Sequence, residues 1–262
     1  MIHTICSPVM GLGNRLKNIA STIRMRDKDE PITIHWDIAG HLMQVPLSSL
    51  FTIEGVKYSE TSSLKVPRNE RCVETWRLLL HPGEVPPHFS VSTNMYSYEC
   101  DGAVIDNEYN RIPQHVVDAY KPIFESFKPN STSVAIAEQI GSPEYAVHVR
   151  TNPVDWPGAR ELHIQRYIDT IHSLPDRVYV CCHTPEVQAI VEGAVPNGKI
   201  YSIPNKQFTN RQIAVAEMLI LGRAKHLFTT LGSTFSEAGW WLGGCQGLVI
   251  QLGQGELKWD AH

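Results

Sequence analysis

The sequence predicts an α/β fold with parallel sheets, and two stretches of the chain carry that prediction. Near the N-terminus, a β-prone run at residues 2–6 is followed by a glycine-containing turn, a helical pattern from Asn14 to about Met25, and a second β-prone run at residues 32–36. This order indicates a βαβ unit, whose two strands are parallel. In the second half of the chain, strands and helices alternate from residue 145 to residue 251, which is typical of a doubly wound sheet.

The elements of the second half follow from short apolar runs that alternate with segments of helical period. We expect strands at residues 145–149, 177–182, 199–202, 226–230 and 248–251. Between them we expect helices at about residues 164–172, 185–192, 212–223 and 235–242. Doubly wound sheets bind ligands at the carboxyl ends of their strands, so the candidate functional loops follow Val149, Cys182, Ser202 and Thr230.

The middle of the chain has the least regular pattern. Residues 47–110 are rich in proline and predict short strands and irregular connections. A helix is predicted at residues 113–127, followed by a loop with the sequence KPNST. We place a domain boundary near that loop, which gives an N-terminal domain of residues 1–130 and a C-terminal domain of residues 131–262.

Composition excludes several classes of protein. The 262 residues are 42% hydrophobic and 19% charged, which favours a globular protein over a disordered one. The formal net charge is −4 and no run of Lys and Arg exceeds two residues, which argues against nucleic acid as a partner. No apolar run approaches the roughly 20 residues of a membrane span, and the first residues lack a signal-peptide pattern, so we expect a cytoplasmic protein. The scattered cysteines are expected to be reduced and mostly buried.

An anion site is predicted where the strand at residues 226–230 meets the following helix. The sequence there, HLFTTLGSTFSEAG, places a Gly-Ser-Thr turn between the two elements. Backbone N–H groups and hydroxyls then converge at one helix N-terminus, which suits a phosphate. The alternative is an ordinary helix cap, in which Ser233 or Thr234 caps the helix and Glu237 completes a capping box with Thr234.

A second candidate lies at the end of the strand at residues 145–149. His148 and Arg150 alternate onto the same face there, and a guanidinium at that place can hold a diphosphate through two parallel hydrogen bonds. The alternative pairs Arg150 with a structural carboxylate such as Glu217 and makes His148 a core histidine.

Other motifs are weaker or absent. The turn GLGNRL, residues 11–16, offers two glycines with Asn14 and Arg15 at its mouth, yet it is not a GxGxxG fingerprint. P-loop, HExxH and GxSxG signatures are absent, and the histidines form no ligand-spaced cluster, so we expect no metal site. The adjacent Trp240 and Trp241 are expected to pack their helix against the sheet rather than to stack on a sugar.

Three segments resemble the conserved motifs of the fucosyltransferase superfamily, which includes the rhizobial nodulation fucosyltransferases, the α1,2- and α1,6-fucosyltransferases and the protein O-fucosyltransferases. The segments are GLGNRL at 11–16, HVR at 148–150 and GSTFSEA at 232–238, and their order and spacing agree with the family. The similarity covers most of residues 145–244 and the first 35 residues.

The resemblance implies a GT-B-like fold, in which two Rossmann-like domains face a cleft, and an inverting transferase that uses GDP-fucose without a metal or other cofactor. The N-terminal domain would face a glycan acceptor and the C-terminal domain would bind the donor. Arg150 would hold the β-phosphate and act as a catalytic residue, and Glu217 would lie near the nucleoside. The implied donor-binding residues are Gly13, Asn14, Arg15, His148, Arg150, Glu217, Gly232, Ser233, Thr234, Phe235 and Ser236.

The chain also departs from the family pattern. Members of the family often carry a second arginine and then an aspartate after the first arginine, whereas Arg150 is followed by Thr-Asn-Pro. A turn that usually ends in an acidic residue reads Cys182-His183 here. These departures leave the base and the sugar of the donor open.

The general base and two rival functions stay open as well. Asp155 is the preferred catalytic base, because it lies in a Trp/Pro-rich loop shortly after Arg150, and Glu161 and His35 are alternatives. One rival function is a sugar phosphorylase or epimerase with the same phosphate grip. The other is a nucleotide-binding protein that has lost its chemistry.

Overall fold

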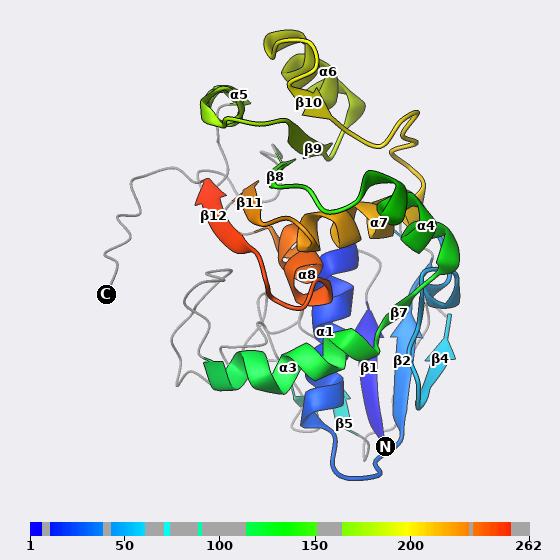
Figure 1. Ribbon diagram of the computed structural model, residues 1–262. Coiled ribbons are helices and arrows are strands. Elements are labelled where there is room, and N and C mark those ends of the chain that lie inside the picture. The colour runs from blue at the N-terminus through cyan, green and yellow to red at the C-terminus, as the bar shows by residue number, and fades with distance from the viewer. Residues whose placement is uncertain are drawn as a thin grey trace. The chain divides into compact units, whose positions relative to one another are not determined.

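The computed structural model describes residues 1–6, 11–38, 43–60, 71–73, 89–90, 114–150, 164–230 and 233–252. The chain divides into two compact units, residues 1–134 and 135–262, and the division falls within helix α4 (Ser131–Ile140). Each unit contains a five-stranded sheet (Figure 1). The α/β class is therefore confirmed, while the acceptor-side and donor-side roles of the two units stay predictions.

The sheet of the first unit is parallel throughout and has the order β4-β2-β1-β5-β6. Its first strand lies at the centre, the chain then moves outward on one side, and it later returns to the other side of β1. This is the strand order of a doubly wound sheet. The strands are β1 (Ile2–Cys6), β2 (Ile32–Trp36), β4 (Val56–Ser59), β5 (Arg71–Val73) and β6 (Phe89–Ser90).

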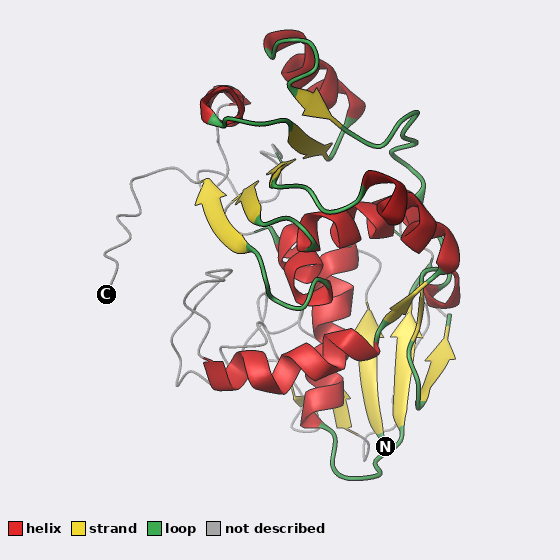
Figure 2. Cartoon of the chain, viewed as in Figure 1, coloured by secondary structure: helices red, strands yellow, loops and turns green. Residues whose placement is uncertain are grey.

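Two helices pack together in this unit (Figures 1 and 2). Helix α1 (Leu12–Met25) contacts β1, β2 and β5 through an apolar stripe that includes the buried Leu16 and Ile19. It begins two residues earlier than predicted. Helix α3 (Gln114–Ser126) packs on α1, within one residue of its predicted bounds at each end.

The prediction of a loop at residues 128–132 is wrong. Lys128–Pro129 forms a short strand, β7, that pairs antiparallel with β3 (Phe51–Thr52), which follows the 3₁₀ helix η1 (Leu47–Ser49). Helix α4 then begins at Ser131. The side-chain oxygen of Asn130 accepts a hydrogen bond from the Ser133 N–H at 2.9 Å, which is a helix-capping contact. An asparagine in a polar segment is equally compatible with a turn and with a helix N-cap, and Asn130 caps α4.

The sheet of the second unit is also fully parallel and has the order β10-β9-β8-β11-β12. The chain moves outward from β8 to β9 and β10, then crosses back to β11 and β12, so the strand order reverses between β8 and β11. The predicted strands are confirmed to within one residue at each end. They are β8 (Tyr145–Val149), β9 (Val178–Cys182), β10 (Ile200–Tyr201), β11 (His226–Thr230) and β12 (Leu248–Leu252).

Helices cover both faces of this sheet (Figure 2). Helices α5 (Ile164–Ser173) and α6 (Pro185–Ala194) share an apolar core with side chains of β8 and β9, including Val147 and Val180. Helices α7 (Arg211–Gly222) and α8 (Thr234–Leu242) pack against each other on the other face. All four lie within two residues of their predicted bounds. Trp241 is fully buried, as expected for a side chain that packs its helix.

Candidate functional site

The carboxyl ends of β8 and β11 are joined through the hydroxyl of Thr230. Its oxygen accepts a hydrogen bond from the Arg150 backbone N–H at 3.0 Å and lies 2.5 Å from the Tyr167 hydroxyl. Burial raises the pKa of Tyr167 to about 12, so this phenol stays protonated at neutral pH. Because strand order reverses between β8 and β11, this point is where open α/β sheets bind their ligands.

The N-terminus of α8 lies beside that point. Ser233 is the N-cap residue, but its side chain makes no capping bond to the helix. Its hydroxyl lies 3.3 Å from Nδ1 of His148 instead. The helix begins at Thr234, so Thr234 is not the N-cap residue that a Thr234–Glu237 capping box requires. Glu237 accepts a hydrogen bond from the indole of Trp241 at 3.3 Å. The first-turn N–H groups of a helix have no intrahelical partner and carry partial positive charge, which favours an anion at this end of α8.

His148 is buried and packs its ring 5.2 Å from that of Phe235, measured between centroids. Burial lowers the pKa of His148 well below 6.5, and the nearby positive charge of Arg150 lowers it further. The imidazole is therefore neutral at pH 7. It orients Ser233 and Phe235 beside the helix terminus and adds no charge to the site.

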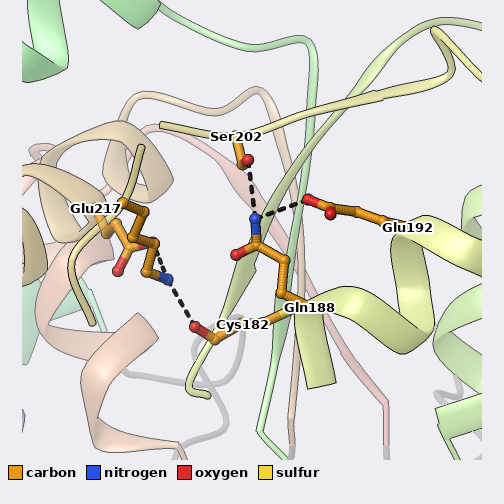
Figure 3. A network of polar contacts seen from close by, with 6 residues as sticks. Cys182, Gln188, Glu192, Ser202 and Glu217 are labelled. Carbon is orange, nitrogen blue, oxygen red and sulfur yellow. Dashed lines mark hydrogen bonds and ion pairs between the residues drawn. The ribbon is translucent and has the colours of Figure 1, made fainter. Parts of the chain in front are cut away.

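Arg150 emerges directly after β8 and is half-buried. The alternative interpretation named Glu217 as a carboxylate that could pair with Arg150. That choice is wrong, because Glu217 forms an ion pair with Lys206 at 2.6 Å. Figure 3 shows Glu217 near Cys182, whose carbonyl accepts a hydrogen bond from Lys206 at 2.7 Å. Sequence reasoning missed Lys206, because one lysine in a polar loop gives no signal of burial. Contact of Glu217 with a nucleoside stays a prediction.

The N-terminal motif residues lie in the first turn of α1, in the other unit. Gly13 and Arg15 are buried, whereas Asn14 is exposed. Nη1 of Arg15 donates a hydrogen bond to the Asp37 carbonyl at 2.8 Å, and its guanidinium lies 4.6 Å from the ring centroid of Trp36. Arg15 thus supports the end of β2. Contacts of these three residues with a donor stay predictions.

Three of the predicted residues, Asp155, Glu161 and Gly232, lie outside the described residues. The third candidate base, His35, is buried on β2, and its Nε2 lies 2.8 Å from Nδ1 of His3. Burial and the neighbouring His3 lower the pKa of His35 to about 4. So weak a base is poorly suited to accept a proton from an acceptor hydroxyl at neutral pH.

The lowered pKa of His35 predicts acid sensitivity. Between pH 6.5 and about 4 the unfolded chain binds a proton at this residue and the folded chain does not, so stability is lost as the pH falls through that window. We expect His35→Gln to lose less stability than the wild type between pH 7 and pH 4.5, by an amount on the order of 2 kcal/mol. Urea unfolding at the two pH values measures this. His172→Gln, at an exposed position, serves as the control, and identical pH dependence in all three proteins would contradict the assignment.

No protein-family model and no curated protein matches the chain. Its structure is similar to that of the fucosyltransferase NodZ from Bradyrhizobium, at 18% identity over 91% of this chain and 92% of that one, with a TM-score of 0.54. It is also similar to a mutant of Arabidopsis thaliana FUT1, at 16% identity over 96% and 69% of the two chains and a TM-score of 0.54. POFUT1 matches at 13% identity over 95% and 97%, with a TM-score of 0.51.

The chain has the fold of a fucosyltransferase. The resemblance to the fucosyltransferase superfamily is thereby confirmed at the level of fold. The correspondence of the individual motifs stays a prediction. Among these fucosyltransferase structures, NodZ has been soaked with GDP-fucose, FUT1 was obtained in complex with GDP, and POFUT1 in complex with GDP-fucose.

Two further findings concern the part of the chain that the structure describes. Within it, no helix is both long and apolar enough to cross a membrane. Its His, Cys, Asp and Glu side chains form no group of three or more that could hold a metal ion.

Proposed function

We propose that the chain is a glycosyltransferase that moves fucose from GDP-fucose onto a hydroxyl group of a glycan or similar acceptor. The observation that carries the proposal is the meeting of Arg150 and the N-terminus of α8 at the reversal of strand order in the second unit. Fucosyltransferases of similar fold that bind GDP or GDP-fucose support this choice of donor. The proposal includes a GT-B-like arrangement, with the acceptor on the side of the first unit.

The proposed reaction is a single nucleophilic displacement that inverts the configuration at the anomeric carbon of the sugar. The acceptor oxygen attacks the anomeric carbon while the bond from that carbon to the β-phosphate oxygen breaks. The electron pair of the broken bond stays on the diphosphate, and the acceptor proton passes to a general base. Negative charge therefore grows on the β-phosphate, where the guanidinium of Arg150 and the N–H groups of α8 would stabilise it.

Metal independence and the identity of the base are part of the proposal. In this proposal the guanidinium and the helix terminus face the diphosphate before charge develops. They would then need no reorganisation and could take the part that a metal ion plays elsewhere. We assign the base to Asp155. Its replacement by asparagine, which keeps the shape and removes the proton acceptor, tests that assignment through kcat.

Ligand-induced stabilisation tests the proposed donor. A nucleotide that binds only the folded chain raises stability by about 2.7 kcal/mol at 100 times its Kd. We expect GDP to raise Tm, with UDP, ADP and CMP much less effective, and we expect the same rise in EDTA as in Mg²⁺.

Each other outcome has its own meaning. If no nucleotide raised Tm, donor binding would be contradicted. If UDP or ADP alone raised Tm, the donor would carry uracil or adenine in place of guanine. Turnover without an acceptor would indicate a phosphorylase or epimerase, whereas GDP binding without any product would indicate a protein that has lost its chemistry. The anomeric configuration of the product, read by NMR, tests inversion.

A further inference from the structure

The loop between β10 and α7, residues 202–210, is anchored at its start, middle and end. At its start, Ser202 accepts a hydrogen bond at 3.1 Å from the amide of Gln188 on α6, which also donates to Glu192 at 2.7 Å (Figure 3). At its end, the side chain of Asn210 accepts from the Gln212 N–H at 2.9 Å and caps α7. Connecting loops usually run over the surface with few such ties. This loop is therefore held in one position.

The middle anchor is Lys206. Asn205 adopts a left-handed backbone conformation with a φ of 52°, which asparagine tolerates better than most residues, and the chain turns there. Lys206 follows with its side chain only 4% exposed. Its ammonium lies 2.6 Å from the carboxylate of Glu217, donates to the Cys182 carbonyl at 2.7 Å, and lies 4.1 Å from the ring centroid of Phe208. One lysine thus joins the loop, α7 and the end of β9.

Stability by itself is a weak explanation for this buried ion pair. The side chains of Lys206 and Glu217 are 4% and 6% exposed, and removing two charges from water costs so much that an apolar pair of similar volume is often equally stable or more so. Burial raises the pKa of Glu217, and the charge of Lys206 only partly offsets this effect. Burial acts to lower the pKa of Lys206, but the neighbouring Cys181 and Glu217 outweigh it and raise that pKa.

The position of the ion pair suggests a different role. The residue after Cys182 is His183, whose backbone N–H donates to the Val149 carbonyl at 3.3 Å, and the next residue after Val149 is Arg150. Contacts therefore lead from Lys206 through the ends of β9 and β8 to the backbone from which the guanidinium of Arg150 emerges. Burial and then the charge of Arg150 lower the pKa of both His148 and His183, and the charge of Lys206 adds a smaller effect in the same direction, as expected of a nearby cation.

We propose that Lys206 and Glu217 are positioning residues that hold loop 202–210 and the end of β9 as a preformed wall of the nucleotide site. The inference rests on the proposed function for the identity of the ligand. A wall that is fixed before binding removes the cost of ordering it when the nucleotide arrives. In this role the ion pair acts through the backbone and makes no contact with the reacting carbon. Its loss would weaken the binding of the substrate and of the transition state equally, so KM would rise with little change in kcat.

The test is the double variant Lys206→Met/Glu217→Leu. It leaves no unpaired buried charge, so it is expected to fold, and it removes the donor to the Cys182 carbonyl. We expect the Kd for GDP and the KM for GDP-fucose to rise at least about tenfold, with kcat within about threefold of wild type. Hydrogen exchange without nucleotide is expected to accelerate at the amides of His183 and Arg150. The loss of a direct contact between Glu217 and the nucleoside would raise Kd and KM but would leave this exchange unchanged, so weaker binding with unchanged exchange would overturn the inference.

An ion pair at the opposite ends of the strands in the same sheet supplies the control. Lys225 and Glu144 form an exposed ion pair at 2.7 Å beside the amino ends of β11 and β8. Lys225→Met removes one charged residue of the same type from the same sheet and is expected to change neither the Kd for GDP nor the exchange at His183. The amide of His226 donates to the Glu144 carbonyl at these amino ends. Its exchange rate is expected to stay unchanged in the double variant.

Wild-type affinity for GDP in the folded double variant would overturn the inference, and so would a fall in kcat at unchanged KM. If the wild type itself bound no GDP, the proposed function would fail. Amide exchange alone would then test the positioning role of Lys206 and Glu217. Faster exchange at His183 and Arg150 would then support the positioning role, and unchanged exchange would overturn it.

Discussion

Replacing Arg150 by alanine is expected to lower kcat/KM at least about a hundredfold, as does the loss of one preorganised oxyanion donor in other enzymes. The guanidinium is the positive side chain that follows β8 at the reversal of strand order, so its contribution is greatest when charge grows on the leaving diphosphate. The fold should persist, because the backbone N–H and carbonyl of this residue both contact the Thr230 hydroxyl, and alanine keeps these contacts.

Steady-state kinetics with GDP-fucose, together with urea unfolding, measure both halves of this prediction. Arg150→Lys is expected to fall between wild type and alanine, because lysine keeps the charge and loses the planar two-bond grip. Arg166→Ala, at an exposed position on α5, is the matched control and should keep wild-type turnover. Near-normal turnover in Arg150→Ala would remove the guanidinium from the mechanism.

The second large effect is expected at Gly222, where α7 meets α8. A Cβ at Gly222 would lie 2.1 Å from the carbonyl oxygen of Gly239, and one at Gly243 would lie 2.0 Å from that of Gly222. Both obstacles are backbone atoms, which cannot rotate away, so Gly222→Ala must push the helices apart. We expect it to destabilise the chain by about 3 kcal/mol or more, at the upper end of the usual cost of overpacking. Movement of α8 would also weaken GDP binding.

Gly193 provides the control for the intrinsic effect of alanine. It lies in α6, and a Cβ there would meet nothing within 4 Å. Gly193→Ala is expected to stabilise the chain by up to about 1 kcal/mol, because alanine lowers the entropy of the unfolded state. Urea unfolding compares the two variants, and equal stability would mean that the contact of α7 with α8 tolerates a methyl group.

Local pattern was enough to predict most elements of the second unit. Strands such as β8 and β11 are short apolar runs, and α6 begins with Thr184 and Pro185, a cap and a first-turn proline that mark a helix start in the sequence itself. The segment around Ser233 likewise indicated an anion site, because a strand, a turn and a helix N-terminus follow one another along the chain there. Arg150 was a separate candidate, because it follows an apolar strand. All these signals span only a few residues.

Helix α4 shows where local pattern fails. Its cap, Asn130, also donates to the Leu50 carbonyl, 80 residues earlier in the chain. A polar KPNST segment is equally compatible with a loop, and the contact that favours the capped helix cannot be read from neighbouring residues. The buried Lys206 is a similar case, because its partner carbonyl at Cys182 and its partner Glu217 belong to different elements.

The alternation of strands and helices, the parallel sheets and the motif residues that make an anion site chemically reasonable can all be predicted from the order of residues along the chain. Four features became known only from the folded chain: the order of the strands, the contact of Arg150 with Thr230 across 80 residues, the ion pair of Glu217 with Lys206, and the close approach of Gly222 to Gly239. The two groups of features differ in how far apart along the chain the interacting residues lie. Helical period, strand alternation and capping act between near neighbours in the chain, whereas burial and packing select partners that are close only after the chain has folded.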